Sequence, residues 1–511
     1  MLNITPYPYK IMEGNGYFPI GSELLTLKDF EQIDNFRWLR LVCDDNFSVD
    51  GNSAESYRLE ITQDGVVVTS ACRAGVFYAF VTLIQLASAY DNNLPCAVIE
   101  DKPQYSYRGF MMDVGRYFYS VDEIKKLVDL CALHKINIFH WHLTEDQGWR
   151  IEIKKYPLLA TKGGWRTHTN FNCKKHGGFY TQTEIKDIVA YCHARQIEVI
   201  PEIDMPGHMQ AAISCYPYLS CFDRDLPVAT HWGVKHDILC AGKDATYRFV
   251  YDVLDEIIEL FDSKYIHIGG DEAPKMRWEI CPNCQAKMKA AGLENCDQLQ
   301  AYFMNKIAQY LSSKGKTAIM WNEIYPSGTV GGDITWQIWH FDNKEKLKDI
   351  VDDCNAKSRK VIYSFSGSTY LDLPYKMVPV ERTYKMSPEL DGLNPQNMLG
   401  VEAPLWTEYV PTYRKAIYMT IPRLGSLSEL MWSPIGGRLF SDWRNRLDGY
   451  NKFLAKQGYT PTKMQHCFPN KLRASAEASW FNRRPLHWHG LHNLIDDAKV
   501  KKLANKQAQP K

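Results

Sequence analysis

From Tyr107 onward the chain alternates short apolar segments with longer amphipathic ones, and this alternation constrains the fold more than any other feature. The apolar segments have the length of buried strands. They lie at Arg108–Val114, Ile136–Leu143, Ile197–Ile203, Tyr265–Gly270, Thr317–Trp321, Ile334–Trp339, Val361–Phe365 and Met398–Ala403. The amphipathic segments carry apolar residues at helical spacing, as in Val121–His134, Thr181–Arg195, Ala245–Phe261 and Gln298–Ser313. Repeated strand–helix units connect by right-handed crossovers and therefore build a parallel sheet.

Eight such strands predict the α/β fold class, with a closed (β/α)8 TIM barrel as the catalytic domain. A doubly wound open sheet is the alternative. It would need fewer strands and a glycine-rich phosphate loop, and no G-x-G-x-x-G motif follows any of these strands.

The chain is too long, at 511 residues, for one hydrophobic core, so more than one domain is expected. Residues 1–103 are predicted to form a small non-catalytic α/β domain with a hairpin (Tyr57–Thr62 and Val66–Ser70) and one helix (Ala74–Ala89). The barrel would span residues 104–456, its last helix running from about Asp442 to Lys456. Residues 457–511 are a C-terminal extension, with histidines at 487, 489 and 492 and a basic end, that we expect to be solvated.

The charge balance argues against polyanionic partners. Lys and Arg number 60 and Asp and Glu 59, a net charge of +1. Such a chain has no long-range field to attract nucleic acid or an anionic membrane, so a neutral partner is expected. The 14 Trp and 30 Tyr would suit stacking on sugar rings, although core packing explains such residues equally well. We allow for a homodimer.

No export signal or membrane-spanning segment is recognisable. Residues 1–10 lack a basic region followed by an apolar run, and no apolar stretch is long enough to cross a bilayer. The expected location is cytoplasmic at face value, or that of a trimmed exported protein.

The cysteines give no expectation of a metal or cofactor. Most of the 14 are scattered singly, and several, such as Cys131, Cys192 and Cys240, lie in apolar segments typical of buried, reduced thiols. Cys281 and Cys284 form the one close pair. A lone C-x-x-C without a second pair at matching spacing is weak evidence for zinc.

Chemically active side chains gather where the predicted strands end. In a TIM barrel these ends build the active site. Carboxylates and tryptophans dominate there: Asp113, Glu145, Asp146, Glu202, Asp204, Asp271, Glu272, Trp321, Glu323, Trp339, Trp406 and Glu408, with His208 among them. No serine or cysteine nucleophile elbow appears. Carboxylates beside aromatic rings at a barrel mouth indicate glycoside chemistry.

The adjacent acids Asp271 and Glu272 are the sharpest feature. Neighbouring side chains on a strand point to opposite faces, so both can enter one site only if the backbone leaves the strand. Gly269 and Gly270 permit that, and Pro274 enforces it. Two close carboxylates cannot both ionise cheaply, so the pair could supply an acid beside an anion. A solvated pair or a helix cap is the alternative interpretation.

Several long motifs resemble glycoside hydrolase family 20, the β-N-acetylhexosaminidases, over roughly residues 57–454. They are Arg108–Asp113 with Arg116, His140–Arg150, Glu202–His208, Gly269–Ala273 and Leu405–Glu408. The first domain is similar to the family's companion domain. One departure is Glu145, where the family often has aspartate. In relatives, the Cys281–Cys284 stretch occurs without implying a metal.

The resemblance implies an exo-acting, retaining hydrolase that removes terminal non-reducing β-linked N-acetylhexosamine by substrate-assisted catalysis. Glu272 would be general acid and then general base. Asp271 would hold the acetamido N–H, and Tyr370 its carbonyl oxygen, as an oxazolinium ion forms. No cofactor is implied.

The resemblance also assigns binding roles. Arg108 and Glu408 would grip sugar hydroxyls, Asp372 would bind the sugar with Tyr370, and Trp321, Trp339 and Trp406 would wall the pocket. Asp146 and His208 would lie behind Glu272 and adjust its proton affinity. Arg108 has a second interpretation, an ion pair on the barrel floor, because it begins its strand. Two other functions stay open: a retaining glycosidase with a carboxylate nucleophile acting on sugars without an acetamido group, and an inactive carbohydrate-binding relative.

Overall fold

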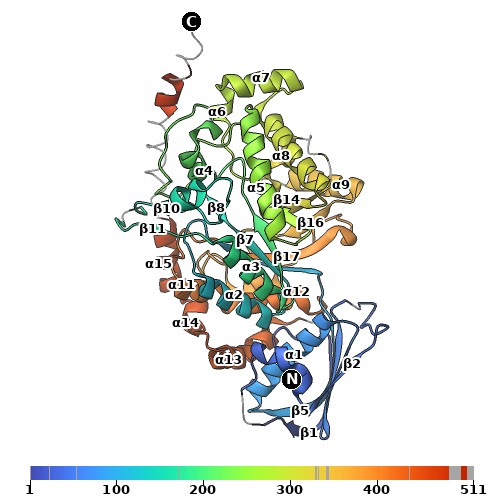
Figure 1. Cartoon of the computed structure of the whole chain (residues 1–511). Coiled ribbons are helices and arrows are strands. Elements are labelled where there is room, and N and C mark those ends of the chain that lie inside the picture. Colours follow the sequence, from blue (N-terminus) through green and yellow to red (C-terminus); the bar gives the residue numbers. More distant parts are fainter. Residues whose placement is uncertain are drawn as a thin grey trace.

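The computed structural model describes residues 2–21, 24–52, 54–170, 172–327, 331, 333–340, 344–436, 438–482, 497–502 and 504. An eight-stranded barrel wrapped by helices stands on a smaller sheet formed by the first hundred residues (Figure 1). The histidines at 487, 489 and 492 lie outside the described residues.

The barrel is closed and all its neighbouring strands are parallel. Its strands, in order around the barrel, are β6 (Tyr107–Asp113), β7 (Ile138–His142), β12 (Glu198–Glu202), β13 (Tyr265–His267), β14 (Thr317–Trp321), β15 (Ile334–Ile338), β16 (Lys360–Tyr363) and β17 (Met398–Leu405). Each overlaps one predicted strand, so the predicted (β/α)8 barrel is confirmed.

Strand β13 is shorter than predicted because the backbone leaves the strand at the two glycines. Gly269 has φ of 66° and Gly270 of 109°, conformations that favour glycine. A Cβ on Gly269 would lie 1.6 Å from Asp204 Oδ1, so the close approach of β12 and β13 at this point also requires glycine.

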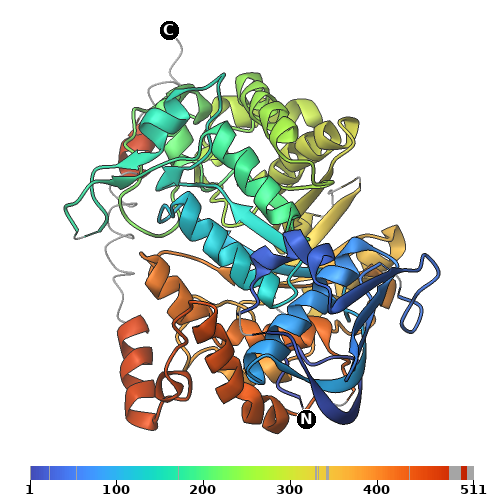
Figure 2. The same cartoon turned by 60° about the horizontal axis from the view of Figure 1, so that its bottom comes forward.

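Helices cover the outside of the barrel (Figure 2). α2 (Val121–Leu133) and α3 (Gln182–His193) begin at capping boxes formed by Ser120 with Glu123 and by Thr181 with Glu184. The other barrel helices of eight residues or more are α5 (Asp244–Leu260), α7 (Pro282–Ala291), α8 (Cys296–Ser313), α9 (Lys344–Lys357), α11 (Tyr413–Thr420), α12 (Arg423–Trp432) and α13 (Phe440–Lys456).

Shorter elements lie in the connections. They are β8 (Thr144–Glu145), β9 (Gly148–Trp149), β10 (Trp165–Arg166), β11 (His176–Gly177), α4 (Gln210–Cys215), α6 (Met276–Glu279), α10 (Val380–Lys385), α14 (Met464–Cys467) and the turns η2 (Leu159–Gly163), η3 (Pro217–Leu219), η4 (Asn322–Ser327) and η5 (Pro395–Asn397). After the barrel, α15 (Lys471–Asn482) packs beside α11 in the picture (Figure 1). Further on, Asp497 binds Arg277 at 2.7 Å and His236 at 2.9 Å. No helix in the described part of the chain combines the length and apolar character needed to span a bilayer.

The first hundred residues form a five-stranded sheet in the order β1-β5-β3-β4-β2, with α1 (Arg73–Ala89) and η1 (Leu27–Asn35) packed against it. The predicted hairpin is β3 (Tyr57–Thr62) and β4 (Gly65–Ser70). The structure adds β1 (Lys10–Pro19), β2 (Leu39–Cys43) and β5 (Asn93–Asp101). Strand β1 is mostly exposed, so it lacks the alternation that identifies a strand.

The barrel interior is layered. Five apolar side chains from barrel strands form a cluster separate from the main core: Tyr107, Ile138, Ile200, Ile319 and Ile362. Toward the carboxyl ends the interior becomes polar. Glu202 accepts hydrogen bonds from His142 and from Trp321 Nε1 at 2.8 Å, and His267 Nδ1 lies 2.8 Å from its carboxylate. This polar layer supports the mouth of the barrel, where the predicted site residues lie.

Candidate active site

The predicted site residues come from seven segments that follow the barrel strands. The segment after β7 carries Asp146, that after β12 carries His208, and that after β13 carries Asp271 and Glu272. Trp321 ends β14, Trp339 follows β15, Tyr370 and Asp372 follow β16, and Trp406 and Glu408 follow β17. Catalytic groups at the carboxyl ends of several strands are the arrangement that a TIM barrel favours.

Asp271 and Glu272 converge on one imidazole although they are consecutive in the chain. His208 Nε2 lies 3.7 Å from Asp271 Oδ2 and 3.6 Å from Glu272 Oε2. Glu272 has a positive φ of 42°, and His208 one of 53°. Left-handed backbone at non-glycine residues is uncommon and concentrates at functional sites. The expected departure from strand geometry is therefore present and turns both carboxylates into one site.

Asp271 is buried and incompletely hydrogen-bonded. Its Oδ1 atom accepts no hydrogen bond from any described residue. Burial, together with the negative charges of Glu323 and Glu272, raises the pKa of Asp271 to about 7, although His208 opposes the shift. A buried acceptor without a donor is costly, and such an atom is expected to have a ligand as its partner.

Glu272 is the more accessible carboxylate, with its side chain 42% exposed. Burial alone would raise its pKa, but the hydrogen bond and positive charge of His208, helped by Arg116, lower it instead. The two neighbouring carboxyls therefore have opposite pKa shifts, and Asp271 is the one that holds a proton more readily.

His208 is held from behind by the two acids after β7. Its Nδ1 atom lies 3.1 Å from Glu145 and 3.6 Å from Asp146. Burial would lower the pKa of His208, but Glu145 and the hydrogen bonds to Asp146 and Glu272 raise it well above 6.5. Asp146 and His208 thus lie where they were predicted, behind Glu272. Glu145 was expected at a strand end but was not predicted in this role.

Four aromatic rings form one continuous wall. The centroids of Trp321 and Trp406 are 5.9 Å apart, those of Trp406 and Tyr370 6.2 Å, and those of Tyr370 and Trp339 6.3 Å. Asn322 fixes the end of this wall, because its side chain accepts from the Trp339 N–H at 3.1 Å and donates to His340 O at 2.7 Å. The wall brings all three predicted tryptophans together with Tyr370.

Tyr370 and Asp372 lie on the segment after β16. Burial raises the pKa of Tyr370 well above 10, and Asp372, Asp271 and Glu272 raise it further, so its hydroxyl keeps its proton and can donate. Asp372 is partly exposed beside it.

The prediction that Arg108 binds sugar is wrong. Arg108 begins β6 at the opposite end of the barrel, where it binds Glu55 at 2.6 Å and the carbonyl oxygen of Lys135 at 2.8 Å. Arg116, which follows the carboxyl end of β6, is the arginine at the mouth. Its guanidinium lies 3.8 Å from Glu408 and over the Trp406 ring, 4.9 Å from the centroid. Active-site residues of a TIM barrel follow the carboxyl ends of its strands. That rule would have selected Arg116, because only the residue after the strand can reach the mouth.

Arg116 is itself held by acids. It binds Glu145 at 2.6 Å and Asp113 at 3.4 Å. Asp113 also accepts from the Thr407 N–H and hydroxyl at 3.0 Å each, which ties the end of β6 to the segment that carries Trp406 and Glu408. Burial raises the pKa of Glu408, and Arg116 opposes that shift.

Two further acids near the pair were expected at strand ends but were given no role in the site. Glu323 accepts a hydrogen bond from the Glu272 N–H at 2.8 Å, and burial raises its pKa. Asp204 Oδ1 accepts from the Gly270 N–H at 3.3 Å, and burial beside Asp271 raises its pKa well above the usual value. Their position after barrel strands was the signal that identified them, but it does not show what they contact.

A cleft of about 590 Å³ opens beside Glu272. Its lining includes Glu323, Trp339, His340, Lys275 and Asp297, from the segments that follow β13, β14 and β15. Glu272 therefore faces both His208 and an open cleft.

Five groups of side chains in the described part of the chain are close enough to hold a metal ion. Four of them consist of His and carboxylate groups in the barrel and at its mouth, which contact one another directly. By contrast, Cys281 and Cys284 lie in a buried group with Cys221 and Cys240. The sequence has no second pair at matching spacing and therefore gave only weak evidence for zinc. The structure brings Cys221 and Cys240 beside Cys281 and Cys284 from a distant segment, without a second C-x-x-C motif.

Comparisons with known proteins agree with this geometry. Residues 105–435 match the model of glycosyl hydrolase family 20, catalytic domain, and residues 34–102 match the model of domain 2 of that family. A β-hexosaminidase of Porphyromonas gingivalis is 41% identical, over 88% of this chain and 62% of that protein. One from Akkermansia muciniphila is 34% identical over 79% of this chain and 84% of that protein. This chain thus spans less than two thirds of the Porphyromonas relative.

Solved structures are similar over nearly the whole chain. The β-N-acetylhexosaminidase of Bacteroides fragilis has a TM-score of 0.79 and 31% identity, covering 91% of this chain and 99% of that one. The exo-β-N-acetylglucosaminidase of Vibrio harveyi, solved with N-acetylglucosamine, has a TM-score of 0.78 and 28% identity, covering 90% and 78%. The resemblance found in the sequence is confirmed: the chain belongs to glycosyl hydrolase family 20.

Proposed function

We propose that this protein is an exo-acting β-N-acetylhexosaminidase. It removes a terminal, non-reducing, β-linked N-acetylhexosamine from an oligosaccharide or glycoconjugate, with retention of configuration. The nucleophile is the carbonyl oxygen of the substrate's own acetamido group. The observation that carries the proposal is the convergence of Asp271 and Glu272 on His208, within 3.7 Å and 3.6 Å of its Nε2 atom.

Asp271 orients the acetamido group. Its buried Oδ1 lacks a donor among the described residues, and an amide N–H is a fitting donor for it. That hydrogen bond favours the carboxylate and turns the carbonyl oxygen toward the anomeric carbon. The Tyr370 hydroxyl, which keeps its proton, donates to the same carbonyl oxygen. Charge placed beforehand where positive charge develops, here on the forming oxazolinium ring, lowers the barrier.

Glu272 protonates the glycosidic oxygen and later deprotonates water. Within the protein alone, a proton is favoured on Asp271, whose pKa is raised to about 7, over Glu272, whose pKa is lowered. Catalysis needs the opposite arrangement with the same total charge. Substrate binding can supply it, because the amide N–H stabilises the Asp271 anion and the glycosidic oxygen accepts a hydrogen bond from protonated Glu272.

The remaining residues bind the sugar. The wall of Trp321, Trp406, Tyr370 and Trp339 surrounds the acetamido methyl and the ring face. Arg116, Asp372 and Glu408 bind hydroxyls at the non-reducing end. The cleft beside Glu272 then takes the leaving group, since the acid must stand between the cleaved sugar and the rest of the substrate.

The test compares Asp271→Asn with the parent enzyme on 4-nitrophenyl β-N-acetylglucosaminide and β-N-acetylgalactosaminide. Losing one charge that stabilises the transition state lowers kcat by about 10²- to 10³-fold. Asp129→Asn, a substitution at a partly exposed residue of α2, is the matched control and keeps parental kcat. The parent enzyme is inhibited by an N-acetylglucosamine-derived thiazoline, a mimic of the cyclic intermediate.

Two results would count against the proposal. One is equal turnover of 4-nitrophenyl β-glucoside, which has no acetamido group. The other is a stable covalent adduct with a 2-deoxy-2-fluoroglycoside in intact-protein mass spectra, which would indicate a carboxylate nucleophile. Sugar binding without turnover would indicate an inactive relative.

A further inference from the structure

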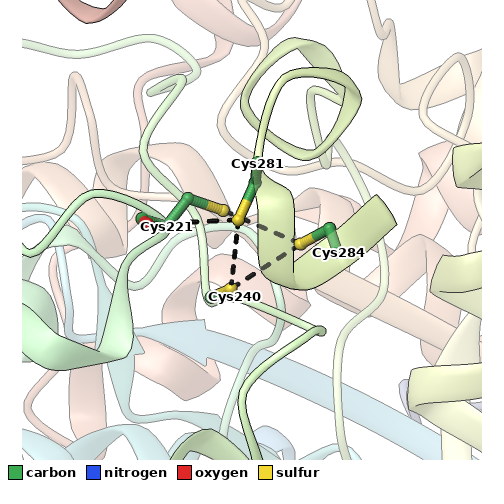
Figure 3. A group of neighbouring side chains, drawn as sticks. All are labelled: Cys221, Cys240, Cys281 and Cys284. Carbon is green, nitrogen blue, oxygen red and sulfur yellow. Dashed lines mark hydrogen bonds between the residues drawn. The ribbon is translucent and has the colours of Figure 1, made fainter. Parts of the chain in front are cut away.

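The side chains of four cysteines lie together in the connections around the barrel, separate from the carboxylates at its mouth. Cys221, Cys240, Cys281 and Cys284 are 5%, 0%, 0% and 0% exposed. Their sulfur atoms all lie within 4.8 Å of one another, and the side chains point toward one another (Figure 3).

The spacing of the sulfur atoms is that of a metal tetrahedron. Cys240 Sγ is 3.6 Å from Cys284 Sγ and 3.8 Å from Cys281 Sγ, and Cys221 Sγ is 3.9 Å from Cys284 Sγ. Four sulfurs bound at about 2.3 Å to one zinc ion lie about 3.8 Å apart at the tetrahedral angle. A disulfide would need about 2.05 Å. The near-equal separations single out no pair.

The local fold presents the thiols from two sides. On one side, an isolated antiparallel bridge between Ser220 and Leu239 holds the segments that carry Cys221 and Cys240 next to each other. On the other, Cys281 is the N-cap of α7 and Cys284 lies in its first turn, with Pro282 between them. A helix amino terminus favours thiolates.

The two sides are in close backbone contact at Gly242. A Cβ on this residue would lie 2.2 Å from the carbonyl carbon of Asn283 and 2.4 Å from the nitrogen of Cys284. Trp278 Nε1 also donates to Leu239 O at 3.0 Å. The cluster is therefore built into a packed junction.

We propose that these four cysteines bind one structural zinc ion. Four sulfur ligands at tetrahedral spacing favour zinc among common divalent ions, and four protein ligands in a buried place leave no open position for catalysis. Zinc binding joins the segment between β12 and α5 (residues 203–243) to the one between β13 and α8 (residues 268–295). The first carries His208 and the second Asp271 and Glu272, so the ion ties together the segments that meet in the site.

The experiment measures metal directly. The whole protein is purified without chelator and its zinc and iron are determined by inductively coupled plasma mass spectrometry. About one zinc per chain is expected. Mercurial modification of the thiols releases that zinc, measured by a colorimetric chelator. After denaturation with a chelator, all 14 cysteines react with a thiol reagent.

Variants assign the ion to the cluster. Cys221→Ser and Cys284→Ser each lose the zinc, whereas Cys192→Ser, at a buried cysteine of α3 outside the cluster, retains it. Removing the ion from the parent protein lowers its Tm, and zinc restores it.

Several results would overturn the proposal. Two disulfides would leave four thiols unreactive and lower the mass accordingly. Free thiols without metal would mean that the four cysteines only pack together in the core. Iron in place of zinc would refute the assignment of the ion. Because metal content is measured without substrate, failure here leaves the proposed hydrolase activity untouched, and loss of activity leaves the metal site untouched.

Discussion

The two ends of strand β6 each carry a buried arginine paired with glutamate, and they serve different purposes. At the amino end, Arg108 binds Glu55 of the first domain with two hydrogen bonds, of 2.6 Å and 2.9 Å. At the carboxyl end, Arg116 binds Glu145 at 2.6 Å, and Glu408 lies 3.8 Å away. The same residue type, eight positions apart, stands once on the floor of the barrel and once at its mouth.

On the floor of the barrel, the polar side chains have hydrogen-bond partners within the protein. Beside Arg108, the carboxylate of Asp101 accepts from Lys135 at 2.8 Å, from Tyr57 at 2.6 Å and from Trp432 at 2.9 Å. At the mouth, like charges crowd together and Asp271 Oδ1 has no donor among the described residues. A polar cluster in which every donor and acceptor has a partner stabilises the fold. A cluster with an unpaired group is expected where a ligand supplies the missing partner.

The largest expected effect is at the mouth, in Glu272→Gln. Losing a general acid costs about 10²- to 10⁴-fold in rate. The loss should be greatest for a disaccharide, whose leaving alkoxide needs a proton, and small in the cleavage step for a 4-nitrophenyl glycoside, whose leaving group is already stable. Steady-state kcat on both substrates, with burst analysis on the second, measures the difference.

The control for this variant is Glu60→Gln, on strand β3 of the first domain, which keeps parental rates on both substrates. Equal losses of Glu272→Gln on both substrates in the cleavage step would contradict an acid role.

The next effect separates the two arginines. Arg116→Lys keeps the charge but loses the planar fork that can bind Glu145 and a sugar hydroxyl together. A hydrogen bond to a charged group contributes about 1.5–3 kcal/mol, so kcat/KM should fall about 10- to 100-fold. The fall should shrink on a substrate analogue that lacks the 4-hydroxyl. Parental kcat/KM would remove Arg116 from sugar binding.

Arg108→Lys is the matched substitution on the floor. It loses hydrogen bonds to Glu55 and to the carbonyl oxygens of Tyr105 and Lys135. The free energy of unfolding should fall by about 2–4 kcal/mol, since buried polar groups lose partners. Denaturant midpoints measure that fall, while kcat/KM of the folded enzyme stays near the parental value. A rise in KM without loss of stability would restore the sugar-binding role to Arg108, which we propose for Arg116 instead.

The sequence predicts the barrel well because local patterns determine it. Apolar strands, amphipathic helices and the glycines before Asp271 are all readable without tertiary information, and the elements lie where they were expected. Strand β1 was missed because its residues are mostly exposed and its pairing partner, β5, is distant in the chain.

The errors in the site have one physical origin. Arg108 was chosen from its place in a motif, although which end of a strand a residue occupies decides whether it can reach the mouth. Cys221 and Cys240 could not be matched to Cys281 and Cys284, because the isolated bridge between Ser220 and Leu239, which holds their segments together, leaves no periodic signal in the sequence. Where function depends on contacts between distant segments, spacing alone is insufficient.

The smallest expected effect tests whether crowded charge sets the proton at the mouth. Glu323 is foremost among the acids that raise the pKa of Asp271, and its carboxylate accepts the Glu272 N–H at 2.8 Å. Glu323→Gln keeps an acceptor for that N–H and removes the charge. Catalysis needs one proton on the pair, and without the Glu323 charge Asp271 loses that proton more easily, so its pKa falls below about 7 and the alkaline limb of kcat/KM moves to lower pH. A pH profile of kcat/KM measures the shift, and on the acid side of the optimum the rate stays near the parental value. Because Arg108→Lys alters no charge at the mouth, its alkaline limb should coincide with that of the parent. A limb that moves equally in both variants, or to higher pH in Glu323→Gln, would mean that the proton held on Asp271 does not govern activity.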